Sequence, residues 1–423
     1  MKVLAYTSPA RGHLFPLVPI LDELARRGHS IAIRTLASEV PLMQQRGFAA
    51  AAISPRIEAI EHDDYLARNP QRKLKRGIAV FATRAEHEVP DLRAAIEAER
   101  PDAILVDAMT WGATAVADAW DGPWAQWFPY PIPLPSPDAP PFGPGLKPAA
   151  GPLHRLRDRA LRPLLLGSMA RVFLPSLNAV RKEVGVRPFG ELAEMFTVAP
   201  LLLYLTAEPF EYPRSDWPSS VRMVGPCCWD PPADPPAWLA EVERPLVLVS
   251  TSSEFQDDGR LVSTALEALA EEDVQVVATV PAAELPRIMV PANARVEPFL
   301  PHTPILARAA CAITHGGAGA TQKALAMGVP VCVVPFGRDQ LEVARRVEVA
   351  GAGTRLTAQR LNTGRLRAKV REAMTKAAGA RRVADGFATA GGPPAAADAF
   401  ETLAGAGGAS RPSRSTTVTR LAS

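Results

Sequence analysis

Apolar and polar positions follow one another along the chain in an order that predicts strands alternating with helices. The apolar run "KVLAYT" (2–7) precedes the polar loop "SPARGH" (8–13). Residues 14–29 then carry apolar side chains at helical spacing, with basic residues and a glycine near the end, as expected for a helix terminus. The apolar run 30–36 follows. Strand, helix and strand in this order predict a βαβ unit with parallel strands.

The same rhythm returns later in the first half of the chain. Residues 88–100 have helical periodicity, 101–108 form a short apolar run and 111–122 are again helical in pattern. This alternation predicts a doubly wound α/β domain with a parallel sheet. Ligands bind such sheets beyond the carboxyl ends of the strands, so the loops at 7–13 and 107–111 are candidate site segments.

Two stretches rich in proline interrupt the rhythm. Residues 128–152 are dense in proline and glycine, which predicts an irregular loop over a binding cleft, with a flexible interdomain linker as the alternative. A basic amphipathic helix is expected at 153–185. The second interruption, 224–245, precedes a new series of strand-like runs. These runs lie at 246–252, 274–280, 311–317 and 329–335.

These patterns divide the chain into two α/β domains of similar size. We expect an N-terminal Rossmann-like domain at 1–215, a linker at 216–242 and a C-terminal Rossmann-like domain at 243–403. The remainder, 404–423, is rich in small and polar residues without periodicity, and we expect it to be a disordered tail.

Composition restricts the class of protein more than it identifies a function. The chain has 423 residues, 47% of them hydrophobic and 22% charged, with a net charge of +3 and no long basic block, so nucleic acid is not expected as a partner. The four cysteines show no C-x-x-C spacing, which fits a reducing cytoplasm. We expect no signal peptide and no membrane-spanning segment, because long uninterrupted apolar runs are lacking.

The stretch "AITHGGAGATQKALAMG" (312–328) predicts an anion site. A strand leads into His315, Gly316 and Gly317, and a helix begins at once after them. Glycines allow a ligand to approach the backbone, and a helix start offers unpaired N–H groups with a positive dipole end. Glycine-rich tight turns without a ligand are the alternative. The preceding strand, the following helix and the histidine favour phosphate binding.

The next strand end carries two more polar residues. Asp339 and Gln340 open a helix after the apolar run 329–335. Asp339 fits simple helix capping, and the pair also fits hydrogen bonding to sugar hydroxyl groups. The residues alone leave both interpretations open.

In the first domain, His13 and Asp107 form a candidate catalytic pair. Histidine can accept a proton from a hydroxyl group near neutral pH, and a carboxylate can fix its tautomer. Asp107 ends the run "AILVD", so it reaches His13 if the two strands are neighbours. A capping or core role for His13 is the alternative.

Other chemistries lack their motifs. The sequence has no G-x-x-x-x-G-K-[ST] loop, no G-x-G-x-x-G after the first strand, no G-x-S-x-G elbow and no H-x-x-x-H pair. These absences disfavour a kinase, a dinucleotide oxidoreductase, a serine hydrolase and a metal site, respectively.

The segments "GHLFPLVPILDELARRGH" (12–29) and "FLPHTPILARAACAITHGGAGATQKALAMGVPVCVVPFGRDQLEVARRV" (299–347) resemble the nucleotide-sugar-dependent glycosyltransferases of the GT-B fold. The similarity covers about residues 1–400 and is strongest to the actinobacterial branch that glycosylates antibiotics and other natural products. It implies two Rossmann-like domains facing across a cleft, with no metal and no cofactor besides the nucleotide sugar as co-substrate.

The resemblance also implies roles for individual residues. His13 matches the general base of the family and Asp107 its supporting carboxylate. The residues matched to donor binding are Ser252, Ser253, Phe299, Leu300, His302, His315, Gly316, Gly317, Ala318, Gly319, Ala320, Thr321, Asp339 and Gln340. Weaker expectations for the acceptor side are Arg11, Gly12, Trp111 and Phe128.

Two positions depart from the pattern of the family. Relatives carry Ser or Thr at the position of Ala320, where the hydroxyl group binds a phosphate, so either phosphate binding is weaker here or Thr321 substitutes for it. Ser252 stands where many relatives have glycine, which changes how the backbone approaches the diphosphate there.

The sequence therefore predicts an inverting glycosyltransferase that moves a sugar from a UDP- or TDP-sugar to a hydroxyl group of a hydrophobic small molecule. Two alternatives stay open: a nucleotide-sugar epimerase of the same fold, and a non-catalytic helper protein related to glycosyltransferases. The resemblance is also compatible with a homodimer.

Overall fold

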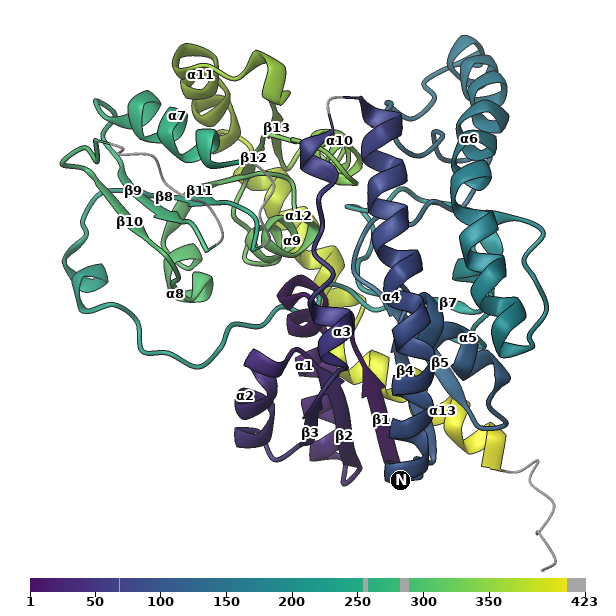
Figure 1. Cartoon of the computed structure of the whole chain (residues 1–423). Coiled ribbons are helices and arrows are strands. Elements are labelled where there is room, and N and C mark those ends of the chain that lie inside the picture. Colours follow the sequence, from purple (N-terminus) through teal and green to yellow (C-terminus); the bar gives the residue numbers. More distant parts are fainter. Residues whose placement is uncertain (68, 254–257, 282–288, 409–423) are drawn as a thin grey trace, which may run out of the picture.

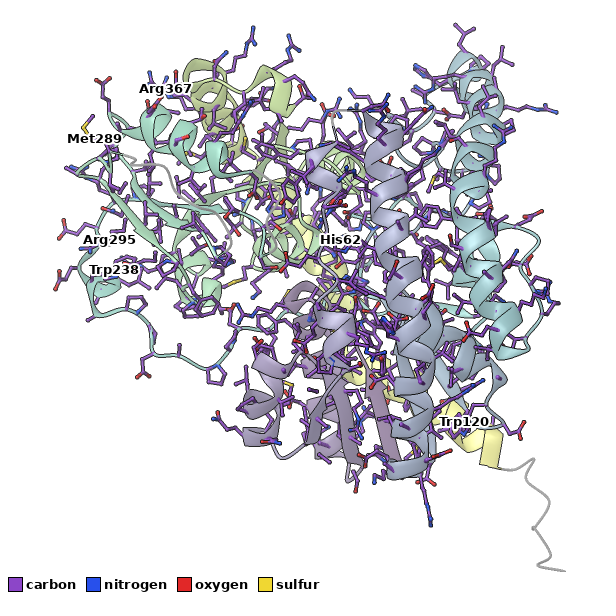
Figure 2. All side chains as sticks on the ribbon, in the orientation of Figure 1. His62, Trp120, Trp238, Met289, Arg295 and Arg367 are labelled. Carbon is purple, nitrogen blue, oxygen red and sulfur yellow. The ribbon has the colours of Figure 1, made fainter. Side chains whose placement is uncertain are left out.

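Two parallel β-sheets, each covered by helices on both faces, make up the protein (Figure 1). The computed structural model describes residues 1–67, 69–253, 258–281 and 289–408. The expected α/β class with two parallel-sheet domains is confirmed. The space between the ribbons is filled by side chains, and at the surface Arg295 lies over the ring of Trp238 (Figure 2).

The first sheet has seven strands in the order β3-β2-β1-β4-β5-β6-β7, and all its pairs are parallel. This order places the ends of β1 and β4 side by side, so the two loops that follow them lie at one edge. The strands are β1 (Lys2–Tyr6), β2 (Ser30–Thr35), β3 (Ala49–Ala52), β4 (Ala103–Asp107), β5 (Trp124–Phe128), β6 (Leu202–Tyr204) and β7 (Val221–Met223).

The second sheet has six strands in the order β10-β9-β8-β11-β12-β13, again all parallel. Its central strand β11 leads directly to His315. The strands are β8 (Leu246–Ser250), β9 (Gln275–Thr279), β10 (Ala294–Glu297), β11 (Ala309–Thr314), β12 (Val331–Val333) and β13 (Gly353–Arg355).

Helices connect the strands and cover the sheets. Those of the first half are α1 (Arg11–Arg26), α2 (Val40–Gln45), α3 (Pro55–Glu58), α4 (Pro70–Glu99), α5 (Trp111–Ala119) and α6 (Pro152–Val184). Those of the second half are α7 (Gly259–Leu269), α8 (His302–Leu306), α9 (Ala318–Ala326), α10 (Gln340–Val349), α11 (Thr363–Met374), α12 (Ala377–Thr389) and α13 (Gly392–Gly408).

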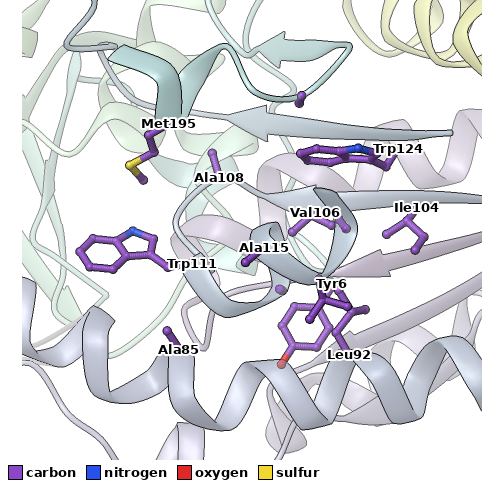
Figure 3. Close-up of a cluster of buried hydrophobic side chains, with 14 of the residues drawn as sticks. Tyr6, Ala85, Leu92, Ile104, Val106, Ala108, Trp111, Ala115, Trp124 and Met195 are labelled. Atoms are coloured by element: carbon purple, nitrogen blue, oxygen red, sulfur yellow. The ribbon is translucent and has the colours of Figure 1, made fainter. Parts of the chain in front are cut away.

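Alternation along the strands produces the two sides of each core. In β1, Leu4 and Tyr6 point into a cluster shared with α4 and α5, whereas Val3 and Ala5 point into a cluster shared with α1 and α13. Because parallel strands are buried on both faces, every residue of β4 and β5 is buried, as Figure 3 shows for part of the first cluster.

The structure shifts one predicted boundary that matters for the site. The loop expected at 7–13 ends at Ala10, and Arg11, Gly12 and His13 form the first turn of α1. Ala10 has extended backbone angles and provides no side-chain cap. The sequence therefore lacked the usual polar start signal, and Gly12 argued against a helix.

The chain passes between the domains more than once. Strand β7 lies within the expected linker 216–242 and belongs to the first sheet. Helix α13 follows the second domain in sequence but packs on α1, where Phe400 is fully buried (Figure 1). Residues 404–408 continue α13, and the rest of the expected tail, 409–423, lies outside the described residues.

Helix α6 bears on the expected absence of a membrane span. Among the residues that the structure describes it is the one helix long and apolar enough to span a membrane by length and composition, and the expectation stays a prediction. The same helix packs against α4 and α5 and buries Leu177 and Val180, while Leu153, Leu156 and Leu164 are exposed.

Candidate active site between the two domains

His13 and Asp107 are held together at the edge of the first sheet. Asp107 is the last residue of β4, and His13 stands one turn into α1, which follows the adjacent strand β1. Their side chains meet with 2.6 Å between Nδ1 of His13 and Oδ2 of Asp107. The expected pairing is present, and it favours neither a capping nor a core role for His13.

The carboxylate of Asp107 is fixed from several directions. It is fully buried, its Oδ2 accepts a hydrogen bond from the amide of Ser8 at 3.2 Å, and its Oδ1 accepts one from the amide of Met109 at 2.9 Å. A carboxylate against Nδ1 makes that nitrogen the N–H donor, so Nε2 is the basic nitrogen of the ring. The ring of Tyr130 packs edge-on against His13, with 5.1 Å between the centroids.

In the second domain, β11 delivers His315 and two glycines to the start of α9. His315 is buried, and its Nδ1 lies 3.4 Å from the carbonyl oxygen of Ser250 at the end of the neighbouring strand β8. Burial lowers the pKa of His315 below its usual 6.5, and the positive charge of Arg338 acts in the same direction. The imidazole is therefore neutral at pH 7 when no anion is bound.

Both glycines are required by close contacts. Gly316 has φ of +94°, and a Cβ there would lie 2.9 Å from Cβ of Gln340. A Cβ on Gly317 would lie 2.5 Å from Nε2 of His315. The imidazole thus rests against the backbone immediately before the first amides of α9, which have no acceptor within the helix. This arrangement suits a phosphate group.

Thr321 does not take over the hydroxyl missing at position 320. It is fully buried, and its Oγ1 lies 2.9 Å from Oγ1 of Thr314, which ties the helix to β11. The more accessible residues of this turn are Gly319 and Ala320. Any phosphate in this region is therefore left to main-chain amides and His315.

Asp339 and Gln340 lie beside this anion site. Asp339 occupies the N-cap position of α10 without making a side-chain cap, which removes the capping interpretation. Its Oδ2 is buried and has no hydrogen-bond partner among the described residues. Oε1 of Gln340 accepts hydrogen bonds from the amides of Phe336 and Gly337, at 2.7 and 3.0 Å, and so holds the loop that presents Asp339.

The electrostatics of Asp339 connect the two domains. Burial raises its pKa to about 6, while the Arg338 guanidinium and the His13 imidazole oppose this shift. His13 therefore lies near enough to Asp339 to act on its charge. The two domains also touch directly on this side. Nε2 of Gln322 in α9 donates a hydrogen bond to the carbonyl oxygen of Leu205 in the first domain, at 3.3 Å.

The residues expected around the nucleoside occupy the neighbouring strand ends. His302 begins α8, and its Nε2 lies 2.9 Å from Oγ1 of Thr279, while burial lowers its pKa to about 4. Phe299 is half exposed and Leu300 packs partly into the core. The buried Ser252 donates its amide to Asp258 at 2.7 Å, and Ser253 is exposed.

The expected acceptor residues fall into two groups. Arg11 and Gly12 are exposed, and Arg11 pairs with Glu39 at 2.7 Å. Trp111 is one of the buried side chains of the first core cluster (Figure 3). It stacks on Phe81, and its indole N–H has no hydrogen-bond partner among the described residues.

Phe128 is buried as well. It packs against Tyr130 and Phe196 within the first core cluster. These contacts favour a core role for it over contact with an acceptor.

Sequence reasoning missed two residues next to the candidate site. Arg338 has φ of +51° and forms an ion pair with Asp64 of the first domain, 2.9 Å between Nη2 and Oδ1. Its position between Gly337 and Asp339, at a strand end, was the available signal. Tyr130 lies in the proline-rich segment, where nothing in the pattern singles out one aromatic residue.

A family of known proteins shares the second domain. Residues 263–403 match the family described as "Erythromycin biosynthesis protein CIII-like, C-terminal domain". The matched region contains the candidate anion site at 315–321 together with Asp339 and Gln340.

One curated relative matches nearly the whole chain. It is 4'-demethylrebeccamycin synthase of Lentzea aerocolonigenes, which is 35% identical over 396 residues, covering 88% of this chain and 91% of the relative.

Solved structures share the arrangement of both domains. The glycosyltransferase of kitacinnamycin superposes with a TM-score of 0.71 at 24% identity, covering 95% of this chain and 98% of the other. The glycosyltransferase VinC in complex with dTDP has a TM-score of 0.68 at 21% identity, covering 96% and 100%. Because the identities are only 24% and 21%, the similarity establishes the fold and nothing more.

Proposed function

The chain belongs to the GT-B glycosyltransferases of natural-product pathways, and on that premise we propose that it transfers a sugar from a nucleoside diphosphate sugar to a hydroxyl group of a small molecule, with inversion. The observation that carries this proposal is the 2.6 Å contact between His13 and Asp107, made beside the charge of Asp339 in the other domain. This is the arrangement expected if His13 is the base and Asp339 binds the sugar.

The proposed reaction is a single displacement. Nε2 of His13 removes the proton of the acceptor hydroxyl group as its oxygen bonds to the anomeric carbon. The bond between that carbon and the phosphate oxygen breaks, and its electrons leave with the diphosphate. Asp107 stabilises the imidazolium that forms and keeps Nε2 directed at the acceptor. One displacement inverts the anomeric configuration.

The leaving diphosphate would be received at the start of α9. The first amides of this helix and its dipole stabilise the developing charge, and His315 adds a ring nitrogen. The diphosphate itself favours the imidazolium form of His315, which offsets the effect of burial on its pKa. No metal ion takes part in this scheme.

The donor would be oriented by residues around the anion site. Phe299 offers an exposed ring to a nucleobase, and Asp339 offers its buried Oδ2 to a sugar hydroxyl group. The structurally similar VinC binds dTDP, which favours a thymidine diphosphate sugar over a uridine diphosphate sugar.

We propose a hydrophobic acceptor and a cytoplasmic enzyme. Tyr130 packs on the ring of His13, and its aromatic side chain beside the proposed base suits an apolar acceptor. The four cysteines are free thiols, which is compatible with a reducing compartment. No observation favours the epimerase or the non-catalytic helper, because neither explains a base supported by a carboxylate on the acceptor side.

The test combines donor binding with product analysis. Thermal stabilisation by dTDP, UDP and a panel of their sugars identifies the donor, since a ligand that binds the folded state raises the melting temperature. The anomeric configuration of the product, measured by NMR, then reports inversion. Failure of every nucleotide to stabilise the protein would refute the donor assignment, and retained configuration would refute the single displacement.

A further inference from the structure

The proline-rich segment 129–151 has no helix or strand to hold it, yet most of its first half is buried. It leaves the end of β5 at the edge that carries His13, and Tyr130 at its start packs on the His13 ring. A long irregular segment keeps one conformation only if other contacts fix it. Both domains supply such contacts, Arg214 and Ser215 from the first, Glu342 and Arg345 from the second.

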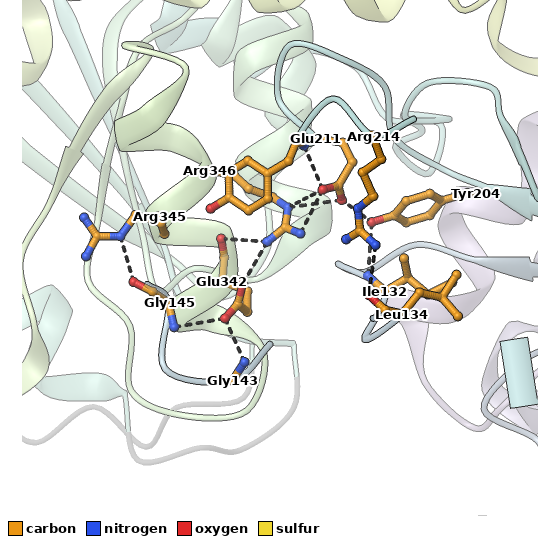
Figure 4. Close-up of polar contacts among 11 residues, drawn as sticks. Ile132, Leu134, Gly143, Gly145, Tyr204, Glu211, Arg214, Glu342, Arg345 and Arg346 are labelled. Carbon is orange, nitrogen blue, oxygen red and sulfur yellow. Dashed lines mark hydrogen bonds and ion pairs between the residues drawn. The ribbon is translucent and has the colours of Figure 1, made fainter. Parts of the chain in front are cut away.

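Glu342, in the first turn of α10, binds the far end of the segment (Figure 4). Its Oε1 accepts hydrogen bonds from the amides of Gly143 at 2.8 Å and Gly145 at 2.9 Å. Gly145 has φ of +60°, and a Cβ there would lie 2.4 Å from the carbonyl oxygen of Leu341. The segment therefore rests directly on the helix, and only glycine fits at the point of contact.

Arg345 adds a second tie to the same point. Its Nε donates to the carbonyl of Gly145 at 2.7 Å, so both polar groups of this glycine are bound by α10. Arg345 also pairs with Glu348 on the helix, which lies outside the contact with the segment. On the same helix, Arg345 therefore provides a test variant and Glu348 a control.

The near end of the segment joins the same network through Arg346. Oε2 of Glu342 lies 3.0 Å from Nη1 of Arg346, whose Nη2 lies 2.8 Å from Oε1 of Glu211. Glu211 accepts a hydrogen bond from the hydroxyl group of Tyr204, and the same hydroxyl accepts one from the amide of Ile132 at 3.1 Å. The chain of contacts therefore begins and ends on one segment.

The burial of this network makes it specific. Glu211, Glu342 and Arg346 are at most 2% exposed. Buried ions lose their hydration, and ion pairing offsets this cost only when the partners have a well-defined geometry. Such a network therefore tolerates one arrangement of its partners. The relative placement of the segment and α10 is fixed accordingly.

We propose that Glu342 is a positioning residue that couples the donor site to the acceptor side. It locks the segment that contacts the His13 ring to the helix that begins at the donor residues Asp339 and Gln340. The coupling holds the acceptor hydroxyl group near the anomeric carbon and favours transfer over attack by water. This inference rests on the proposed function for the identity of the two substrates.

The first experiment needs no acceptor. Amide hydrogen exchange of residues 131–146 is measured with and without dTDP in the wild-type protein, in Glu342→Gln and in the control Glu348→Gln. We expect dTDP to slow exchange in the wild type and the control, and to have no effect on this segment in Glu342→Gln. An equal response in all three proteins would overturn the proposal.

The second experiment separates coupling from a structural role. With dTDP-glucose and UDP-glucose as donors and 4-methylumbelliferone as a phenolic acceptor, we expect the ratio of transfer to donor hydrolysis to fall at least tenfold in Glu342→Gln. The dissociation constant for dTDP should change less than twofold. Equal loss of transfer and hydrolysis would show a structural role only.

Arg345→Gln keeps the proposal testable if Glu342→Gln does not fold. It removes a main-chain contact with Gly145 but leaves the buried ion pairs intact, so the same ratio should fall by about threefold, and an unchanged ratio would count against coupling. Absence of transfer by the wild-type protein, despite dTDP binding, would instead refute the proposed function.

Discussion

Arg338, one residue before Asp339, is ion-paired with Asp64 of the first domain, with 2.9 Å between Nη2 and Oδ1. The pair ties the loop that presents the candidate sugar-binding carboxylate to the first domain. The charge of Arg338 also reaches His315, whose pKa it helps to lower. A guanidinium group at this place is suited to a bound diphosphate.

Replacement of Arg338 should therefore weaken nucleotide binding. We expect Arg338→Ala to raise the dissociation constant for dTDP about fivefold in calorimetry, with a small change in melting temperature because partly exposed ion pairs contribute at most ~1 kcal/mol. Asp64→Asn removes the ion-pair partner of Arg338 but keeps the positive charge of Arg338, so dTDP affinity should stay equal or increase. Equal weakening by both variants would point to a purely structural pair.

The proposed catalytic pair, His13 and Asp107, makes a prediction about turnover. We expect His13→Ala to lower kcat by ~10²–10⁴-fold, the usual contribution of a positioned general base, while dTDP affinity changes less than twofold. Asp107→Asn should also lower kcat, because an amide can favour the wrong imidazole tautomer. His87→Ala on α4 serves as the control, because His87 belongs neither to the His13–Asp107 pair nor to the candidate donor site. Normal turnover in His13→Ala would exclude it as the base.

Diphosphate binding should be coupled to proton uptake. Burial and Arg338 lower the pKa of His315 in the free protein, whereas a bound dianion raises it. Titration calorimetry with dTDP near pH 6.5, in buffers of different ionisation enthalpy, should show uptake of part of one proton. The uptake should vanish in His315→Gln. If wild type and variant behave alike, the imidazole binds the diphosphate in its neutral form.

Asp339 should destabilise the free protein above pH 6. Burial raises its pKa to about 6 from the usual 3.8, so the folded state holds this proton more tightly than the unfolded state. The resulting stabilisation is fully present below pH 3.8 and is lost as the pH rises through about 6. Asp339→Asn should therefore melt at a higher temperature than wild type at pH 7.5, with a smaller difference at pH 4.5.

The same substitution should impair use of the sugar. Loss of the carboxylate should raise the KM for the donor sugar while dTDP affinity is retained, since dTDP carries no sugar for Asp339 to bind. The exposed Asp385, changed to Asn, is the control for a loss of charge without burial. A lower melting temperature for Asp339→Asn at pH 7.5 would contradict the argument.

A hydroxyl group restored at position 320 should strengthen diphosphate binding. Ala320 lies in the first turn of α9, and Thr321 is occupied by Thr314. We expect Ala320→Ser to improve dTDP affinity about fivefold, equivalent to ~1 kcal/mol for one added hydrogen bond. Ala326→Ser, at the other end of the helix, should have no effect. Unchanged affinity in Ala320→Ser would place the diphosphate elsewhere.

How much the sequence could predict differs between the parts of this site. The strand–helix rhythm placed Asp107 and His315 at strand ends, because apolar runs and glycines carry that information locally. The start of α1 was missed because no polar cap marks Ala10. The burial of Thr321 and Phe128 depends on how elements pack, which a local pattern does not contain.

The network around Glu342 was out of reach for a related reason. Glu342 and its glycine partner Gly143 are 199 positions apart, and Arg346 and Glu211 are 135 apart. Each residue looks like an ordinary charge on an amphipathic helix or in a loop. Only the folded arrangement of the two domains shows that they are partners.

The return of α13 to the first domain has a practical consequence for hybrid proteins. The amide of Gly392 donates to the carbonyl of Val224 at 2.8 Å. The segment that leaves the first domain therefore contacts the segment that returns to it. A recombinant chimera that exchanges the second domain, which we propose recognises the donor sugar, should be spliced at both places, near 224 and near 391. It should keep the native C-terminal helix together with the native first domain. Splicing once would bring a foreign helix to the surface that Phe400 fills here.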